Sequence, residues 1–430
     1  MIQARTLPGM MELLPEDQII FNEMKDAIEG VFQNHGFFPL DTPAMENLEI
    51  LTAKGGGETS KQIYEIKGSK RDIGLRFDLT VPLAKYVALY FSDLEFPFRR
   101  YHIGKVYRGE RNQKGRYREF YQCDIDIIGH NKLSLYNDGE VASVMADIFK
   151  ELQLDYRFHY NNRKLLNGFF ESLGISRFTE TLRIIDKLAK IGRDKVTEEL
   201  LELGLEEGPI QRILDFIAID GSNDEILERL KNLGIEDGGY VEGLHELEKV
   251  YRIMTELGVP KERIHIDLSI TRGLDYYTGT VLETFLKDHE NLGSICSGGR
   301  YDDLAGNYTK QKLPGVGLSI GLTRLFFLLQ EENLLPKTAE KKISAMVLPM
   351  KGFEDQGIEI LKKLRDAGKI VICHTESGKI GKKFQFADRM NIPYVIVIGE
   401  DEIKSGRFSL RDMETGDQEQ LSLDKIIEKL

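Results

Sequence analysis

The stretch from Arg100 to Gly129 reads RYHIGKVYRGERNQKGRYREFYQCDIDIIG and indicates the kind of sheet on which this chain is built. Two segments with alternating apolar residues flank a loop rich in arginine and lysine, so residues 98–129 predict a β-hairpin. A period of two sends alternate residues to opposite faces of a strand. In the second arm one face is apolar, and the other carries Arg118, Gln122, Asp124 and Asp126.

The charged face of this hairpin has two interpretations. An edge hairpin with one solvated face is common in antiparallel sheets and needs no function. Alternatively, the amide and the carboxylates form a surface that binds a polar ligand. Two other segments favour the second interpretation. In LRFDLT, Asp78 and Thr80 would share one face of a strand, and ITRGLDYYTG would place Arg272, Tyr276 and Tyr277 around a glycine turn between two strands.

Two further segments indicate a site for a phosphate-bearing ligand. GVGLSIGLTR carries glycines at 315, 317 and 321 and ends in Arg324 at a predicted strand-to-helix transition. Such glycines permit close backbone approach to a ligand, although tight helix–sheet packing is the alternative. The run does not match the dinucleotide-binding fingerprint. The second segment is the cationic hairpin loop, with Arg108, Glu110, Arg111, Lys114 and Arg116. Arginine side chains match the geometry of phosphate oxygens, and a solvated charged turn is the alternative.

Length, charge and cysteine content restrict the class of protein. With 430 residues, two or three domains are expected. A formal charge of -12 argues against coating nucleic acid through bulk charge, but it permits a local basic groove. Cys123, Cys296 and Cys373 are far apart, and no CxxC or HxxxH spacing predicts a structural zinc site. Without a signal peptide or a membrane-spanning run, we expect a cytoplasmic protein with reduced thiols.

The order of predicted elements divides the chain into three domains. Helical spacing begins near Pro15 and is followed by an extended segment that ends in DTP at Pro43. Between residues 161 and 257 we expect consecutive helices closed by glycines, which form a helical insertion. Residues 1–160 and 258–335 would then make one discontinuous domain. Beyond a boundary at 336–342, apolar strands alternating with helices predict a small α/β domain with a mostly parallel sheet over residues 340–430.

Taken together, these residues resemble a known family. YRGE after a strand looks like motif 2 of class II aminoacyl-tRNA synthetases, GVGLSIGLTR looks like motif 3, and the helix and strand that end at Pro43 look like motif 1. RGLDYYTGTVLE and GRYREFYQCDIDIIG are similar to signatures of the histidyl-tRNA synthetases. The resemblance covers nearly the whole chain. It implies an α+β fold, with an antiparallel-sheet catalytic domain, the helical insertion and a C-terminal α/β anticodon-binding domain.

The resemblance also implies a two-step reaction. Histidine and ATP would give histidyl-adenylate and pyrophosphate, and the histidyl group would then pass to the 3′ end of its tRNA. Arg108 and Arg272 would be the catalytic cations at the α-phosphate. ATP, accompanied by Mg²⁺ because pyrophosphate is polyanionic, would be bound by Arg108, Glu110, Arg116 and Arg324. No protein residue is assigned as a metal ligand.

The remaining implied roles concern histidine, tRNA and assembly. The ammonium group of histidine would meet Asp78, Thr80 and Gln122, with Leu79 in the same segment, and the imidazole would meet Asp126, Tyr276 and Tyr277. Motif 1, from about Asp17 to Pro43, would form a homodimer. Five lysines are expected near tRNA, although each could equally lie on an ordinary solvated helix surface: Lys362, Lys363, Lys379, Lys382 and Lys383.

Three alternatives stay open at this stage. The first is a non-catalytic paralogue that serves as a regulatory subunit of ATP phosphoribosyltransferase in histidine biosynthesis. The presence of Arg108, Arg272 and Arg324 and of a C-terminal α/β domain argues against it. The second is another class II synthetase, for threonine, proline or glycine, which RGLDYYTG disfavours. The third is a Rossmann oxidoreductase, in which the carboxylate strand would have no role.

Overall fold

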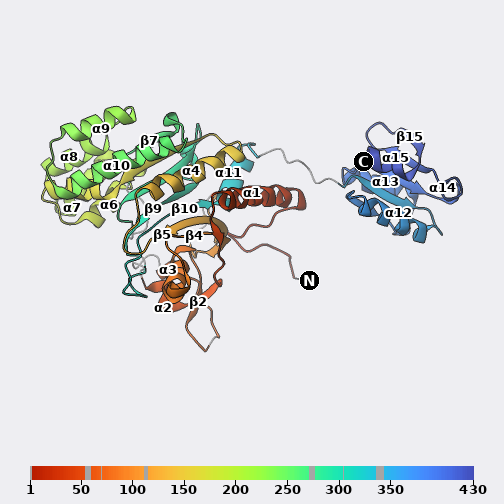
Figure 1. Ribbon diagram of the computed structural model, residues 1–430, viewed down its shortest axis with the longest axis horizontal. Helices are drawn as coiled ribbons and strands as arrows, with labels where there is room; N and C mark the ends of the chain where they lie inside the picture. The colour runs from red at the N-terminus through yellow and green to blue at the C-terminus, as the bar shows by residue number, and fades with distance from the viewer. Residues whose placement is uncertain are drawn as a thin grey trace. The chain divides into compact units, whose positions relative to one another are not determined.

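The computed structural model describes residues 2–53, 60–68, 70–110, 115–270, 277–303, 305–335 and 343–430. The chain divides into two compact units, Met1–Pro336 and Lys337–Leu430 (Figure 1). The hydrophobic cores of the two units are separate, so each unit is described by itself. Among the described residues, no helix combines the length and the apolar character needed to cross a bilayer.

An eight-stranded sheet forms the centre of the first unit, in the order β1-β4-β5-β10-β9-β8-β6-β7. Its pairs are antiparallel, except that β1 runs parallel to β4 and β6 runs parallel to β7. The predicted hairpin over residues 98–129 is confirmed as β4 and β5. The strands are β1 (Phe38–Pro39), β4 (Phe98–Tyr107), β5 (Glu119–Ile128), β6 (Tyr156–Asn162), β7 (Ile264–Ile266), β8 (Thr280–Leu286), β9 (Cys296–Tyr301) and β10 (Gly315–Gly321).

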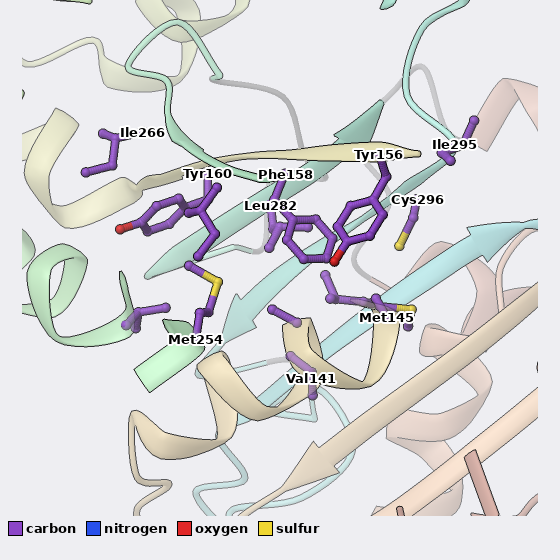
Figure 2. Close-up of a cluster of buried hydrophobic side chains, with 14 of the residues drawn as sticks. Val141, Met145, Tyr156, Phe158, Tyr160, Met254, Ile266, Leu282, Ile295 and Cys296 are labelled. Carbon is purple, nitrogen blue, oxygen red and sulfur yellow. The ribbon is translucent and has the colours of Figure 1, made fainter. Parts of the chain in front are cut away.

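Helices cover one face of this sheet and bury the apolar positions of its strands. Figure 2 shows Phe158 and Tyr160 of β6 and Leu282 of β8 facing Met145 of α4 and Met254 of α10, and all five side chains are buried. The apolar residues of β5 and β10 belong to the same core. The helices that pack on this face are α1 (Pro15–Asn34), α4 (Tyr136–Glu151), α10 (Gly238–Glu256) and α11 (Leu322–Glu331).

The predicted run of helices between residues 161 and 257 is present, but it begins two residues later than expected, at Arg163. Asn161 and Asn162 end β6, and the Asn162 side chain accepts hydrogen bonds from the backbone N–H groups of Lys164 and Leu165 to cap α5. The hydrophobic core of these helices is continuous with that of the sheet. The division into a separate insertion domain therefore remains a prediction. The helices before α10 are α5 (Arg163–Ser172), α6 (Phe178–Ile185), α7 (Leu188–Glu202), α8 (Glu207–Ile217) and α9 (Asn223–Asn232).

A small substructure lies at the strand-to-helix segment LRFDLT, and here one expectation is wrong. Strand β3 (Ile73–Leu75) ends before Asp78, and helix α3 (Thr80–Leu89) already begins at Thr80. Asp78 and Thr80 therefore do not share a strand face. The Asp78 carboxylate accepts a hydrogen bond from the Val81 N–H at 3.0 Å and satisfies an unpaired donor of the first helical turn. The adjoining elements are β2 (Met45–Asn47) and α2 (Leu48–Thr52).

The second unit has a five-stranded sheet in the order β12-β11-β13-β14-β15. Only β12, β11 and β13 are parallel, so the expectation of a mostly parallel sheet is wrong for the far half. A short connection joins β14 and β15, and an antiparallel pair can be closed by such a turn whereas a parallel pair cannot, while the short helix α14 lies between β13 and β14. Its elements are β11 (Ala345–Pro349), α12 (Glu354–Asp366), β12 (Val371–Cys373), α13 (Ile380–Arg389), β13 (Tyr394–Ile398), α14 (Glu400–Ser405), β14 (Phe408–Asp412), β15 (Gln418–Leu421) and α15 (Leu423–Lys429).

Candidate active site

The carboxylates of β5 lie inside the protein, so the interpretation as a solvated edge is wrong. β5 is an interior strand between β4 and β10. Asp124 and Asp126 are each only 3% exposed. Burying a charged group is costly unless it is paired. These side chains therefore need partners within the protein or a bound ligand.

Asp126 is held by two buried side chains. Its Oδ2 lies 2.5 Å from Arg100 Nη2, and its Oδ1 accepts a hydrogen bond from the Tyr301 hydroxyl at 2.7 Å. The same Arg100 nitrogen donates to the Leu79 carbonyl at 3.3 Å. Burial raises the pKa of Asp126, and the Arg100 charge opposes that rise. The carboxylate is therefore fixed in position before any substrate arrives.

The glycines of GVGLSIG have different roles from those expected. A Cβ at Gly317 would lie 2.1 Å from Asp126 Oδ1, and a Cβ at Gly315 would lie 2.3 Å from the Tyr301 ring. These two glycines make room for the Asp126 and Tyr301 side chains of the carboxylate network. Gly321 alone among the three lines the neighbouring cavity.

A cavity of about 300 Å³ opens beside this network, at the ends of β5, β9 and β10. Arg108 is fixed at its wall, because its Nε donates to the Phe77 carbonyl at 2.9 Å and its guanidinium stacks 5.1 Å from the centre of the Phe120 ring. Arg324 Nη2 donates to the Leu292 carbonyl at 2.5 Å. The lining residues are Arg108, Glu110, Gly115, Arg116, Tyr117, Phe120, Gln122, Ser294, Ile295, Cys296, Ser297, Ser319, Gly321 and Arg324.

Gln122 connects the cavity with the buried carboxylates. Its Nε2 donates to Ser319 Oγ at 2.8 Å, and Ser319 in turn hydrogen-bonds Asp124. Within the described part of the chain, Gln122 Oε1 is buried and has no hydrogen-bond partner. Because a buried polar atom normally has a partner, this oxygen is a candidate acceptor for a ligand donor.

Asp78 also has one oxygen without a partner. Its Oδ1 accepts from the Val81 N–H, while its Oδ2 is buried and unpaired among the described residues. Burial raises the pKa of Asp78 to about 6, against the lowering effect of the Val81 hydrogen bond and of the Arg108 charge. Burial likewise raises the pKa of Asp124 to about 7, against the Arg100 charge. The site thus holds carboxyl groups whose charge changes near neutral pH.

The predicted site residues fall into two groups, and some lie outside the described residues. Arg108, Glu110, Arg116, Arg324 and Gln122 come together around the cavity. Asp126 and Tyr277 are not among the residues that line it, and the Tyr277 ring comes within 3.2 Å of the Cβ that a side chain at Gly299 would have. Leu79 and Thr80 stay at the start of α3. Arg272 and Tyr276, with the loop residues Arg111 and Lys114, lie outside the described residues.

Other residues of the site were not identified from the sequence as ligand-binding or positioning groups: Arg100, Asp124, Tyr301 and Ser319. The alternation of β5 places Asp124 on the charged face of its strand, but the sequence alone does not indicate its role. Ser319 faces it across the sheet, and only the register of β5 against β10 shows this. In the second unit Lys362, Lys363, Lys379 and Lys382 are exposed, and Lys383 is half-buried.

Comparison with known proteins identifies the family. A family model described as histidyl-tRNA synthetase matches residues 9–325, and one described as an anticodon binding domain matches residues 344–430. The chain belongs to the histidyl-tRNA synthetase family. A histidine–tRNA ligase of Finegoldia magna is 56% identical over all of both chains. One of Clostridium tetani is 54% identical over 99% of this chain and 98% of the relative.

Solved structures agree with this assignment. A crystal structure of histidyl-tRNA synthetase from a Nostoc species superposes over 100% of both chains with a TM-score of 0.88, at 40% identity. The class II α+β fold with its anticodon-binding domain is thereby confirmed. The activity is that of a histidine–tRNA ligase, with histidine, ATP and tRNA as substrates, and not that of the regulatory paralogue.

Proposed function

We propose that histidyl-adenylate forms where the arginine-lined cavity meets the carboxylates of β5. The histidine carboxylate attacks the α-phosphorus of ATP, a new P–O bond forms, and pyrophosphate leaves with the electrons of the broken P–O bond. This step needs no protein nucleophile, because catalysis consists of positioning and of neutralising charge that builds on phosphorus. The observation that carries this proposal is the gathering of Arg108, Arg116 and Arg324 around one cavity.

Within this proposal Arg108 acts at the α-phosphate. Its backbone hydrogen bond and its stacking on Phe120 hold the guanidinium in place before substrate binds. A charge that is already oriented needs little reorganisation as the transition state forms. Arg272 supplies a second cation by its place in the family signature.

ATP is oriented by Glu110, Arg116 and Arg324. Glu110 Oε2 lies 3.6 Å from Arg116 Nη1, and both line the cavity. Glu110 is the carboxylate that the described cavity wall offers to Mg²⁺. This fits an ion that usually takes one or two carboxylates together with substrate phosphates and water. When bound, Mg²⁺ would neutralise charge on the departing pyrophosphate.

Histidine is recognised by acceptors at its ammonium group and by a fixed pair at its imidazole. Asp78 Oδ2 and Gln122 Oε1 are unpaired acceptors in the described part of the chain, and an ammonium group would satisfy both. Leu79 and Thr80 form the start of α3 next to Asp78 and belong to the same proposed binding segment. Asp126, already oriented by Arg100 and Tyr301, meets the imidazole together with Tyr276 and Tyr277. A site with buried polar groups rejects amino acids that leave them unsatisfied.

The second step brings tRNA to the anticodon-binding domain and its 3′ end to the adenylate. Proteins read RNA sequence mostly at unstacked bases of single-stranded loops, which suits an anticodon loop. The candidate contacts to the RNA are Lys362, Lys363, Lys379, Lys382 and Lys383. The enzyme acts as a homodimer through motif 1. Phe38 within that segment and Met45 just beyond it are exposed hydrophobic residues. We place it in the cytoplasm.

Exchange of labelled pyrophosphate into ATP, driven in turn by each of the twenty amino acids, tests the first step. Histidine should drive exchange, and near-isosteric amino acids should not. Exchange driven equally well by another amino acid would contradict the proposal. Replacing Lys379, Lys382 and Lys383 together by alanine should weaken tRNA charging and leave the exchange reaction unchanged.

A further inference from the structure

Two histidines and an aspartate come together at the far edge of the catalytic sheet. His159 of β6 and His265 of β7 are direct neighbours in a parallel pair, and Asp267 follows β7. His159 Nδ1 lies 2.8 Å from Asp267 Oδ2, and the two imidazole rings are 5.0 Å apart between centres. β8 separates β6 from β9, which lines the active-site cavity. This cluster is therefore distinct from the site described above.

The three side chains are arranged so that one ion could contact all of them. Each offers a ligand atom, and these atoms lie within 4.8 Å of one another. His159 Nε2 is buried and unpartnered within the described residues, so this imidazole has a nitrogen with no assigned role. Within the described part of the chain this is the one group of its kind.

The surroundings fix the carboxylate, and one further carboxylate lies near His265. Ser269 donates to Asp267 Oδ1 from its backbone N–H at 2.9 Å and from its hydroxyl at 2.6 Å, while Oδ2 contacts His159 Nδ1 at 2.8 Å. An ion bound here would take the place of that His159–Asp267 contact. Hydrogen bonds such as those from Ser269 orient metal ligands and support their affinity. Asp220, in the connection between α8 and α9, has its Oδ1 3.7 Å from His265 Nε2 and is largely exposed.

We propose that His159, His265 and Asp267 form a zinc site, with Asp220 or water as the fourth ligand. Two imidazoles and a carboxylate are ligands that Zn²⁺ prefers, and Mg²⁺ or Ca²⁺ would require oxygen donors instead. β6 leads into the helices α5 to α10 and β7 follows them. An ion at this place fastens the two strands at the base of the helical segment. No spacing along the chain indicates this site, because its ligands come from two segments that are about 100 residues apart.

Titration of the full-length, metal-free protein with Zn²⁺ and with Co²⁺ tests the proposal. Co²⁺ should give visible d–d absorption bands of a site with nitrogen and oxygen ligands, and Zn²⁺ should displace it. Zn²⁺ should also raise the Tm. Replacing a ligand, as in His265→Asn, should weaken Zn²⁺ binding at least about tenfold, since even indirect partners of a metal site contribute that much.

Two further variants keep the outcome decisive. Asp267→Asn retains the acceptor for Ser269 but loses the charge, so it should fold and still lose affinity. His35→Asn is the matched control, because His35 pairs with Asp147 at 2.9 Å without a third ligand, and its Zn²⁺ affinity should equal that of the wild type. The proposal is overturned if the wild type gives no Co²⁺ bands, or if both site variants bind Zn²⁺ as tightly as the control.

Discussion

The two halves of the proposed active site, one for the nucleotide and one for the amino acid, differ in how their charges are held before substrate arrives. In the nucleotide half, around Arg108, Arg116 and Arg324, the cations surround an open cavity of about 300 Å³. In the amino-acid half, around Asp78, Gln122 and Asp126, the carboxyl groups are buried. The nucleotide half can therefore screen its charges with water, whereas the amino-acid half must satisfy them internally.

This difference fits the ligand that we propose for each half. A polyanion is recognised by charge, and arginine forks at a cavity wall provide it. A small amino acid must be recognised by its hydrogen bonds to buried polar groups, because a wrong amino acid leaves those groups unpaired and so loses binding free energy. Asp126 is paired in advance by Arg100 and Tyr301, while Asp78 and Gln122 each keep one acceptor unsatisfied within the described residues. The amino-acid half thus combines a fixed frame with two acceptors reserved for the ligand.

The largest effect should come from the nucleotide half. Arg108→Ala should lower the single-turnover rate of adenylate formation on the order of 10²–10³-fold, because it removes an oriented charge that acts on the transition state. Histidine affinity, measured by equilibrium binding, should change little. We expect the same result for Arg272→Ala. A near-normal rate in both variants would separate these arginines from the chemistry.

Asp126→Asn should damage the amino-acid half selectively. It exchanges an acceptor for a donor beside the imidazole, and losing a hydrogen bond to a charged group costs about 1.5–3 kcal/mol. That corresponds to roughly one to two orders of magnitude in kcat/KM for histidine. KM for ATP should stay unchanged in pyrophosphate exchange.

Tyr301→Phe is the control for Asp126→Asn. It removes one hydrogen bond to the same carboxylate but leaves the charge and the Arg100 pair intact, so its effect on histidine should be smaller. Thermal unfolding of both variants shows whether the fold is preserved. An equal loss of ATP and histidine affinity in Asp126→Asn would mean that the two halves are not separate.

The pH dependence of histidine binding should identify Asp78. Because burial raises its pKa to about 6, Asp78 gains a proton as the pH falls through that value and loses the charge that faces the ammonium group. Histidine affinity should then fall by about tenfold per pH unit below about 6. The substrate imidazole titrates in the same range, so the measurement is a comparison with Asp78→Asn. Identical slopes in the two proteins would exclude Asp78 from the ammonium site.

Ser319→Ala should have the smallest effect, because it acts through Gln122. The Ser319 hydroxyl accepts the Gln122 Nε2–H at 2.8 Å and so fixes which amide atom is left for the ligand. Losing a neutral hydrogen bond costs about 0.5–1.5 kcal/mol, or roughly 2- to 10-fold in KM for histidine. Ser297→Ala is the matched control, since Ser297 lines the same cavity from β9. Equal effects of the two substitutions would indicate a general change in the cavity.

Local patterns in the sequence predicted much of this arrangement. The alternation in β5, the helical spacing of α1 and the transition from β10 to α11 are periodic signals within one element, and the structure confirms them. Contacts between side chains on different strands could not be predicted from the sequence. The partners of Asp126 lie on β4 and β9, and Gly317 is required by a side chain on the neighbouring strand. Asp78 was expected in a strand because its ability to cap a helix competes with the apolar alternation around it.

The most direct test of this account is a structure of the full chain with L-histidine bound. We expect the ammonium group within hydrogen-bonding distance of Asp78 Oδ2 and Gln122 Oε1, and the imidazole beside Asp126, with the Arg100–Asp126 pair unchanged. Histidine bound on another strand, or an ammonium group that leaves both of these acceptors unpaired, would contradict the central claim that the buried charged face of β5 is the floor of the histidine site.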